Sequence, residues 1–182
     1  MPRLYLVRHA RATGGFGEAA DPALDDLGQK QAEAMATTLA PLGPLPMLTS
    51  PLRRARDTAA ALERHWNTMA IVDAGVGEVP APSDDLAERE KWIRQAMGQT
   101  WTDLGPRYTS WRTMVTELLL RIKADTVVVS HFVAINAVIG HATGDDRVMC
   151  AALGNASVTT VDHDNRSFTL VDIGEQDATV VQ

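Results

Sequence analysis

The sequence predicts an α/β fold, a three-layer α/β/α sandwich with a mostly parallel central sheet. Short apolar runs typical of buried strands alternate with longer segments of helical periodicity, which is the pattern of such folds. The chain has 182 residues, of which 45% are hydrophobic, enough to bury a sizeable core. Because no repeat or linker is visible, we expect residues 1–182 to form a single domain.

The first predicted strand and helix precede a proline-rich break. Leu4–Val7 is an apolar run of the kind found in central strands that are covered on both faces. A helix is expected from Asp25 or Asp26 to about Ala40, where prolines and a glycine end it. The apolar residues expected on its buried face are Leu27, Ala34, Met35, Leu39 and Leu42.

Two further strands, at Met47–Thr49 and Ala70–Val72, flank the next predicted helix. Ser50 is expected to cap this helix, because a serine side chain accepts hydrogen bonds from free amides, and Pro51 suits the first helical position. The helix is expected to end near His65.

The second half of the chain predicts three helices, a central strand and a hairpin. In chain order they are a helix capped by Ser83 and ending near Gly98, a helix from Pro106 to Lys123, a strand at Thr126–Val129, a helix at Phe132–His141, and a hairpin of Val158–Val161 with Phe168–Val171. The strand is β-branched throughout and the helix after it is apolar on nearly every side, so both are expected in the core.

Charge and composition exclude several classes of partner. Lys and Arg number 17 against 23 Asp and Glu, a formal net charge of −6, whereas nucleic acids are bound by clustered cations. No apolar run approaches the roughly 20 residues that span a bilayer and no signal peptide is visible, so we expect a cytoplasmic protein without a membrane partner. A single Cys150 forms no intrachain disulfide, and no two histidines have metal-ligand spacing, so neither a metal nor another cofactor is expected.

Two histidines follow the two clearest predicted strands. His9 comes after Leu4–Val7, and His131 comes after Thr126–Val129. Ligands of open α/β sheets bind at the carboxyl ends of the strands, so both imidazoles are expected in one crevice if these strands are neighbours. Arg8 precedes His9 in the same place. Further guanidinium groups come from the first turns of the helix after Ser50, at Arg53, Arg54 and Arg56.

This combination favours a phosphate dianion as the ligand. Guanidinium groups bind phosphate oxygens in pairs, and nearby cations lower the pKa of a histidine, which keeps it neutral and nucleophilic. Attack by His9 would give a phosphohistidine that water hydrolyses, and the leaving alcohol needs a proton from a carboxylic acid. Glu78, in the loop after the third strand, is the preferred acid. The alternatives are Asp84, Asp85 and Glu88.

The motifs of five segments agree in order and spacing with one family. They are Leu6–Ala10, Asp21–Ala32, Ser50–Ala59, Val76–Glu78 and Val129–His131. Together they resemble the histidine phosphatase superfamily, the phosphoglycerate-mutase-like enzymes, over most of the chain. The resemblance implies that family's fold, with His9 as the phosphoryl acceptor and Glu78 as the proton donor. It also implies which side chains hold the phosphoryl group, namely Arg8, Arg54 and His131.

Three positions depart from the family pattern. Ala10-Arg11 stands where many members have Gly-Glu, and Arg11 is a candidate to bind phosphate or a second acidic group of the substrate. Gly15, in a glycine-rich stretch expected to be a mobile loop, stands where mutase-type members carry a phosphate-binding Asn. Phe132-Val133 replaces the common Gly-Gly after the second histidine. These differences leave the substrate open.

We therefore expect a phosphomonoester hydrolase that acts on a small phosphorylated metabolite or a phosphorylated peptide. The alternatives are a phosphoglycerate-mutase-type phosphotransferase and a non-catalytic phospholigand-binding module. The short segment between Glu78 and Pro106 disfavours the mutase, and an intact nucleophile disfavours pure binding. The tryptophans expected over the crevice, as core or as pocket lining, are Trp92, Trp101 and Trp111. The oligomeric state is left open.

Overall fold

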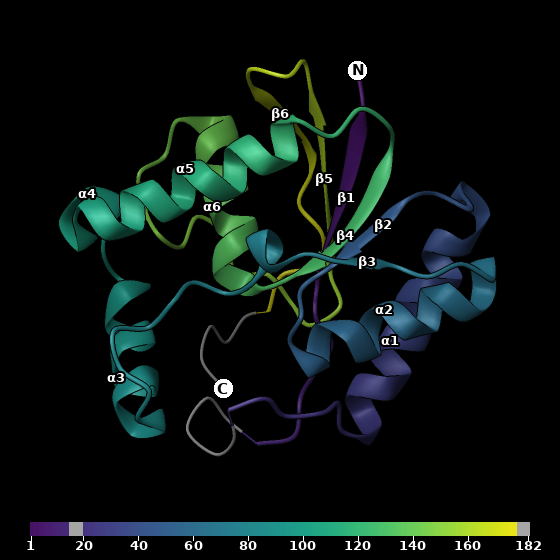
Figure 1. Cartoon of the computed structure of the whole chain (residues 1–182), viewed down its shortest axis with the longest axis horizontal. Helices are drawn as coiled ribbons and strands as arrows, with labels where there is room; N and C mark the ends of the chain where they lie inside the picture. The colour runs from purple at the N-terminus through teal and green to yellow at the C-terminus, as the bar shows by residue number, and fades with distance from the viewer. Residues whose placement is uncertain (15–19, 178–182) are drawn as a thin grey trace.

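Six strands form one sheet in the order β3-β2-β4-β1-β5-β6 in the computed structural model, which describes residues 1–14 and 20–177 (Figure 1). The strands are β1 (Arg3–Arg8), β2 (Met47–Thr49), β3 (Ile71–Val72), β4 (Thr126–Ser130), β5 (Val158–His163) and β6 (Phe168–Asp172). Strands β1 to β4 run parallel, whereas β5 and β6 form an antiparallel hairpin at one side. The predicted mostly parallel sheet and the predicted hairpin are both confirmed.

Helices cover both faces of this sheet. They are α1 (Asp26–Leu39), α2 (Arg53–Trp66), α3 (Leu86–Ala96), α4 (Trp101–Leu104), α5 (Pro106–Leu120) and α6 (Phe132–Thr143), with short 3₁₀ turns η1 (Ala40–Leu42) and η2 (Ala74–Val76). Figure 1 shows α1 and α2 on one side of the sheet and α5 and α6 on the other, which is the predicted three-layer sandwich. None of the helices in residues 1–14 and 20–177 is long and apolar enough to cross a membrane.

The central strands are apolar on both faces because both faces are covered. Adjacent residues of a strand point to opposite sides of the sheet. Leu4 and Leu6 accordingly join the core against α5 and α6, while Val7 joins the core against α1 and α2. Residues Phe132–Gly140 of α6 are all buried, as their nearly uniform apolar sequence predicts, and the one polar side chain among them, Asn136, is hydrogen-bonded.

The buried face of α1 differs from the predicted one. Its buried residues are Gly28, Ala32, Met35, Ala36 and Leu39, whereas Leu27, Ala34 and Leu42 are exposed. One reason is the close approach of the α1 backbone to the chain at Arg11, which only a glycine permits. A Cβ atom at Gly28 would clash with the backbone carbonyl of Arg11. The close approach at Gly28 therefore sets which side of α1 faces the core, and the residues at helical spacing from it, Ala32, Met35, Ala36 and Leu39, are buried with it.

Neither predicted serine cap is correct. Helix α2 begins after Leu52, which has no capping side chain, and Ser50 is buried before the helix. Helix α3 is capped by Asp85, while the Ser83 hydroxyl accepts from the Asp85 amide. Asp85 caps α3 in place of Ser83 because the charge of its carboxylate strengthens the hydrogen bond and is stabilised by the helix dipole.

Candidate active site

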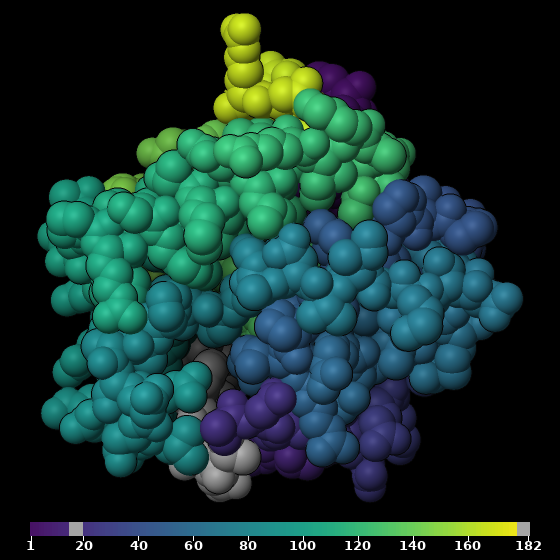
Figure 2. All heavy atoms as spheres, in the orientation of Figure 1, coloured from purple at the N-terminus to yellow at the C-terminus, as the bar shows by residue number. Residues whose placement is uncertain are grey.

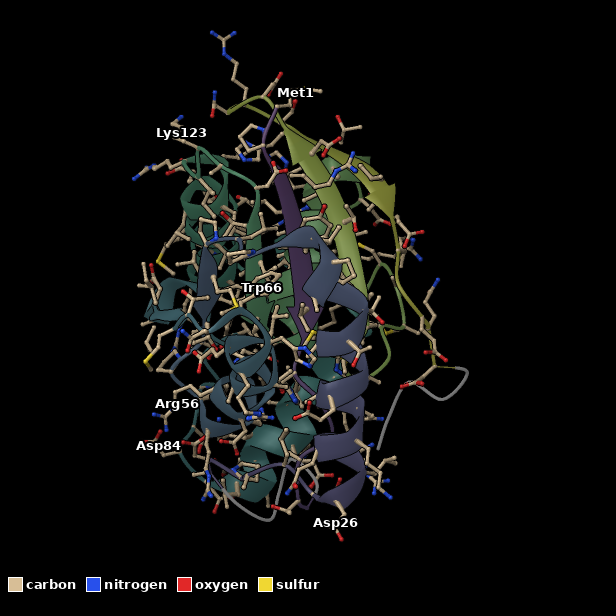
Figure 3. All side chains as sticks on the ribbon, turned by 90° about the vertical axis from the view of Figure 1, so that its right-hand side faces the viewer. Met1, Asp26, Arg56, Trp66, Asp84 and Lys123 are labelled. Carbon is tan, nitrogen blue, oxygen red and sulfur yellow. The ribbon has the colours of Figure 1, made fainter. Side chains whose placement is uncertain are left out.

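Pairing of β1 with β4 brings the two predicted histidines together at the carboxyl ends of the strands. Arg8 lies opposite Ser130 in this parallel pair, and the His9 amide donates to the Ser130 carbonyl at 3.0 Å. The His9 and His131 ring centroids are 5.2 Å apart. Figure 3 shows Met1, just before β1, at one end of the molecule and Asp84 at the other, so the site lies at the Asp84 end.

Of the three arginines at the start of α2, Arg54 is the one that enters the site. Its Nε donates to His9 Nε2 at 3.2 Å, and its Nη2 lies 3.3 Å from His131 Nδ1. Arg54 is 8% exposed, whereas Arg53 and Arg56 are exposed, and Figure 3 shows Arg56 on the surface. One guanidinium group therefore spans both imidazole rings.

Hydrogen bonds fix the tautomer of His9. Its Nδ1 lies 2.8 Å from the Ala10 carbonyl, which can only accept, so Nδ1 carries the ring proton. The other nitrogen, Nε2, then holds a free lone pair, in agreement with the bond it accepts from Arg54. Burial, followed by the charges of Arg54 and Arg8, holds the pKa of His9 well below its usual value. The ring is therefore neutral at physiological pH, with Nε2 available as a nucleophile.

The same reasoning fixes His131, which is fully buried behind His9. An arginine can only donate, so the nitrogen facing Arg54, Nδ1, is the acceptor. The opposite nitrogen, Nε2, then donates to Ser50 Oγ at 2.7 Å. Burial and nearby positive charges lower the pKa of His131 as well. Ser50 thus orients the ring, a role that the sequence analysis missed because a Ser-Pro pair also signals a helix start.

Glu78 faces the two histidines from the loop after η2. Its Oε1 accepts from the Val79 amide at 2.9 Å, and its Oε2 lies 4.0 Å from His131 Nδ1. The side chain is only 12% exposed, and this burial raises the pKa of Glu78 to about 7 despite the opposing effects of the Val79 amide and nearby arginines. The loop is tied to β4 because the Ser130 hydroxyl donates to the Val76 carbonyl at 2.7 Å. The alternative acids at positions 84, 85 and 88 are exposed.

Arg8 reaches the site from the end of β1. Its Nη1 donates to the Leu153 carbonyl, and its guanidinium carbon lies 5.1 Å from the centre of the Phe132 ring. Phe132, one of the departures from the family pattern, thus supplies an aromatic face to a half-buried cation. The Nε of Arg8 has no hydrogen-bond partner among the residues that the structure describes.

Arg8, His9, Arg54 and Glu78 line a cavity of about 340 Å³. Residues around its mouth include Arg11, whose Nε lies 2.6 Å from Asp25 Oδ2. Figure 2 shows the surface hollowed between the teal atoms of α3 and the blue atoms that begin α2. Helix α3 adds Arg89, Trp92 and Ile93 to the lining.

The structure therefore brings all the predicted site residues into or against one cavity. Arg8, His9, Arg11, Arg54 and Glu78 line it, and the buried His131 lies behind. Trp92 is the predicted tryptophan that lines the pocket. No motif in the sequence marks Arg89, although its position three residues before Trp92 signals a shared helix face. Gly15 and the rest of the glycine-rich stretch 15–17 lie outside the described residues.

Comparison with known families gives a match over nearly the whole chain. The model of the histidine phosphatase superfamily (branch 1) matches residues 4–176. A curated glucosyl-3-phosphoglycerate phosphatase from Mycolicibacterium vanbaalenii is 44% identical over 80 residues, which are 42% of this chain and 36% of that protein. The match thus spans about a third of the relative's length.

Solved structures share the fold across their whole length. A mutant phosphoserine phosphatase from Entamoeba histolytica in complex with phosphoserine has a TM-score of 0.76 at 21% identity, covering 96% of this chain and 98% of that one. A mycobacterial glucosyl-3-phosphoglycerate phosphatase in complex with VO3 has a TM-score of 0.70 at 23% identity, covering 97% and 100%. At these identities the likeness establishes the fold.

Proposed function

The chain belongs to the histidine phosphatase superfamily, and we propose that it hydrolyses phosphate monoesters through a phosphohistidine formed on His9. The observation that carries the proposal is the tautomer of this ring, because the Ala10 carbonyl holds the proton on Nδ1 and leaves a lone pair on Nε2 beside Arg54. Binding alone does not require such a nitrogen, whereas nucleophilic attack does.

The phosphoryl group binds between the arginines and the two rings. Arg54 contacts both imidazoles, and a phosphate oxygen is a stronger acceptor for the same guanidinium group. Arg8 supplies the second charge from the end of β1, and His131 a further polar contact. Arg11, held at one nitrogen by Asp25, has its remaining nitrogens for an outer phosphate oxygen.

In the first step, the lone pair of His9 Nε2 attacks phosphorus, and the bond from phosphorus to the ester oxygen breaks. The protonated carboxyl group of Glu78 gives its proton to the leaving oxygen, which departs as an alcohol. A pKa of about 7 leaves a substantial fraction of Glu78 protonated near neutral pH. Its position 4.0 Å from His131 is compatible with a place above the phosphoryl group.

In the second step, the ionised Glu78 takes a proton from a water molecule as the water oxygen attacks phosphorus. The nitrogen–phosphorus bond breaks, its electron pair returns to His9 Nε2, and inorganic phosphate leaves. The carboxyl group is protonated again, so the cycle closes without a metal or redox partner.

The cavity volume favours a small phosphorylated metabolite over a phosphorylated peptide. About 340 Å³ accommodates a compact substrate with most of its surface covered. The names of the relatives point the same way, to phosphoserine and glucosyl-3-phosphoglycerate. A cytoplasmic location stays a prediction from the sequence.

The test is release of inorganic phosphate from a panel of phosphomonoesters by the wild type, His9→Ala and His141→Ala. His141 is exposed and does not line the cavity, so its substitution controls for loss of a histidine. We expect turnover by the wild type and His141→Ala, none by His9→Ala, and an acid-labile phosphoenzyme in quenched wild-type reactions. Turnover by His9→Ala would overturn the mechanism, and an isomerised product without phosphate release would identify a mutase.

A further inference from the structure

The cavity has more positive charge than one phosphoryl group needs. Its described lining contains four guanidinium groups, those of Arg8, Arg11, Arg54 and Arg89. It contains two carboxyl groups, those of Asp25 and Glu78. Asp25 is already paired with Arg11 at 2.6 Å. Because the proposed function assigns Arg8 and Arg54 to the phosphoryl group, the charge of Arg89 is left without an assigned partner.

Arg89 extends from α3 toward the site. It is half-buried and lines the cavity, and the ion pairs and hydrogen bonds of residues 1–14 and 20–177 include none for its guanidinium group. On the same helix, Arg94 is paired with Glu90 at 2.7 Å. Burial is the main cause that lowers the pKa of Arg54, and the positive charge of Arg89 lowers it further, so the two cations are within electrostatic reach of each other. An anion bound near Arg89 would relieve this repulsion.

An apolar wall lies beside Arg89. Trp92 and Ile93 of α3 and Val79 of the loop line the cavity with it. Trp92 is stacked on Tyr108 with ring centroids 5.1 Å apart, so its orientation is fixed by α5. Arg89 and Trp92 are three residues apart and share one face of the helix. The cavity thus offers the arginines at His9 for a phosphoryl group, an apolar wall for a carbon skeleton, and Arg89 for a second anionic group.

We propose that Arg89 is a specificity-determining residue that binds a second anionic group of the substrate, so that the substrate is the phosphate monoester of a small acid. The inference rests on the proposed phosphatase function. The second group is a carboxylate or a second phosphate, since both present paired oxygens to a guanidinium fork.

Two pairs of substrates test the proposal. In the first pair, 3-phosphoglycerate and glycerol 3-phosphate differ in a carboxylate replaced by a hydroxymethyl group. In the second, fructose 1,6-bisphosphate and fructose 6-phosphate differ in a second phosphate. The value of kcat/KM is measured for each with the wild type, Arg89→Gln, Arg89→Lys and the matched control Arg94→Gln. The pair in which the wild type prefers the more acidic member identifies the second anion.

The preference is the ratio of kcat/KM for the more acidic member of the pair to that for the other member. We expect Arg89→Gln to lower this ratio by about 10- to 100-fold, which is the worth of a charged hydrogen bond, mainly through a higher KM for the more acidic member. Arg89→Lys should restore part of it because the charge returns without the fork, and Arg94→Gln should leave it unchanged. Equal losses on both members of a pair, or no loss on either, would overturn the proposal, because Arg89 would then act on the shared phosphoryl group or not at all.

A calorimetric measurement separates this proposal from the proposed function. Binding of 3-phosphoglycerate, glycerol 3-phosphate and the two fructose phosphates is compared in His9→Ala and in His9→Ala with Arg89→Gln. Loss of affinity confined to the more acidic member of a pair supports the role of Arg89, even if the wild type releases no phosphate and the phosphatase proposal fails. Equal affinities in the two proteins would refute it.

Discussion

Replacing Glu78 by glutamine is expected to stabilise the protein at pH 8.5 and to have little pH-dependent effect at pH 4.5. Burial raises the pKa of this carboxyl group from 4.5 to about 7 in the folded protein. Below the lower value the group is neutral in both folded and unfolded chains. As the pH rises to 7, the unfolded chain ionises first, so folding loses stability. The difference between the two pKa values corresponds to about 3 kcal/mol in the free energy of unfolding above pH 7.

The assay is urea unfolding of the wild type and Glu78→Gln between pH 4.5 and 8.5, in buffer free of phosphate. With a slope of about 2 kcal/mol per M of urea, 3 kcal/mol displaces the midpoint of the variant by about 1.5 M at the upper end of this range. Glutamine retains an oxygen for the Val79 amide, so the substitution removes the charge and keeps the hydrogen bond. The histidines titrate in both proteins, and taking the difference removes their contribution.

Glu88→Gln serves as the control, because Glu88 is an exposed carboxylate on α3. The difference between its urea midpoint and that of the wild type should be the same at every pH. If the difference in urea midpoint between Glu78→Gln and the wild type is also the same at every pH, then Glu78 ionises in the folded protein as it does in water. The reasoning that makes it a proton donor near neutral pH would then be refuted.

Three further outcomes follow from the site and its surroundings. With an alkyl phosphate, kcat should fall as the pH rises through about 7 because Glu78 loses its proton, and Glu78→Gln should lower kcat by about 10²- to 10⁴-fold and remove this limb; a pH–rate profile checks both. Ser50→Ala should cost about 1–3 kcal/mol in urea unfolding, because the His131 Nε2 proton is left buried without its 2.7 Å partner; an unchanged midpoint would contradict this. Gly28→Ala should lower the unfolding free energy by about 1–3 kcal/mol, because the new Cβ clashes with the Arg11 carbonyl; thermal unfolding that matches the wild type would exclude the clash.

The sequence was sufficient for the fold class because the strongest signals are periodic and long. The alternation of apolar strands and amphipathic helices predicts the sandwich, and the family model over residues 4–176 confirms the resemblance read from the motifs. That residues 1–182 form a single domain stays a prediction. The wrong predictions concern residues whose side chains suit more than one local role. The Ser50 hydroxyl suits a helix cap as well as a histidine partner, and the choice depends on the position of His131, 81 residues away.

In the site too, the sequence motifs identify the residues, whereas their contacts depend on tertiary packing. Motifs placed His9, His131 and Arg54, and the structure brings their nitrogens within hydrogen-bonding distance. The chemical roles of these residues stay predictions. Helical periodicity does not distinguish Arg54 from its neighbours, because its burial depends on where the ends of β1 and β4 lie. Arg89 carries no motif and becomes visible only when α3 is placed over the cavity.

The central position of β1 has a consequence for how this protein forms during synthesis. The Arg3 amide donates to the carboxylate of Asp125, 122 positions later in the chain, and β1 pairs with β4 and β5. Contacts of such sequence separation form slowly, and at about 5–20 residues per second the first strand waits on the order of 10 seconds for its neighbour to be translated. Until then, the apolar run of β1 has neither sheet partner, which makes a chaperone contact at this strand advantageous. His9 meets His131 at that same moment, so phosphate binding should appear late and abruptly, as a reporter of completed folding.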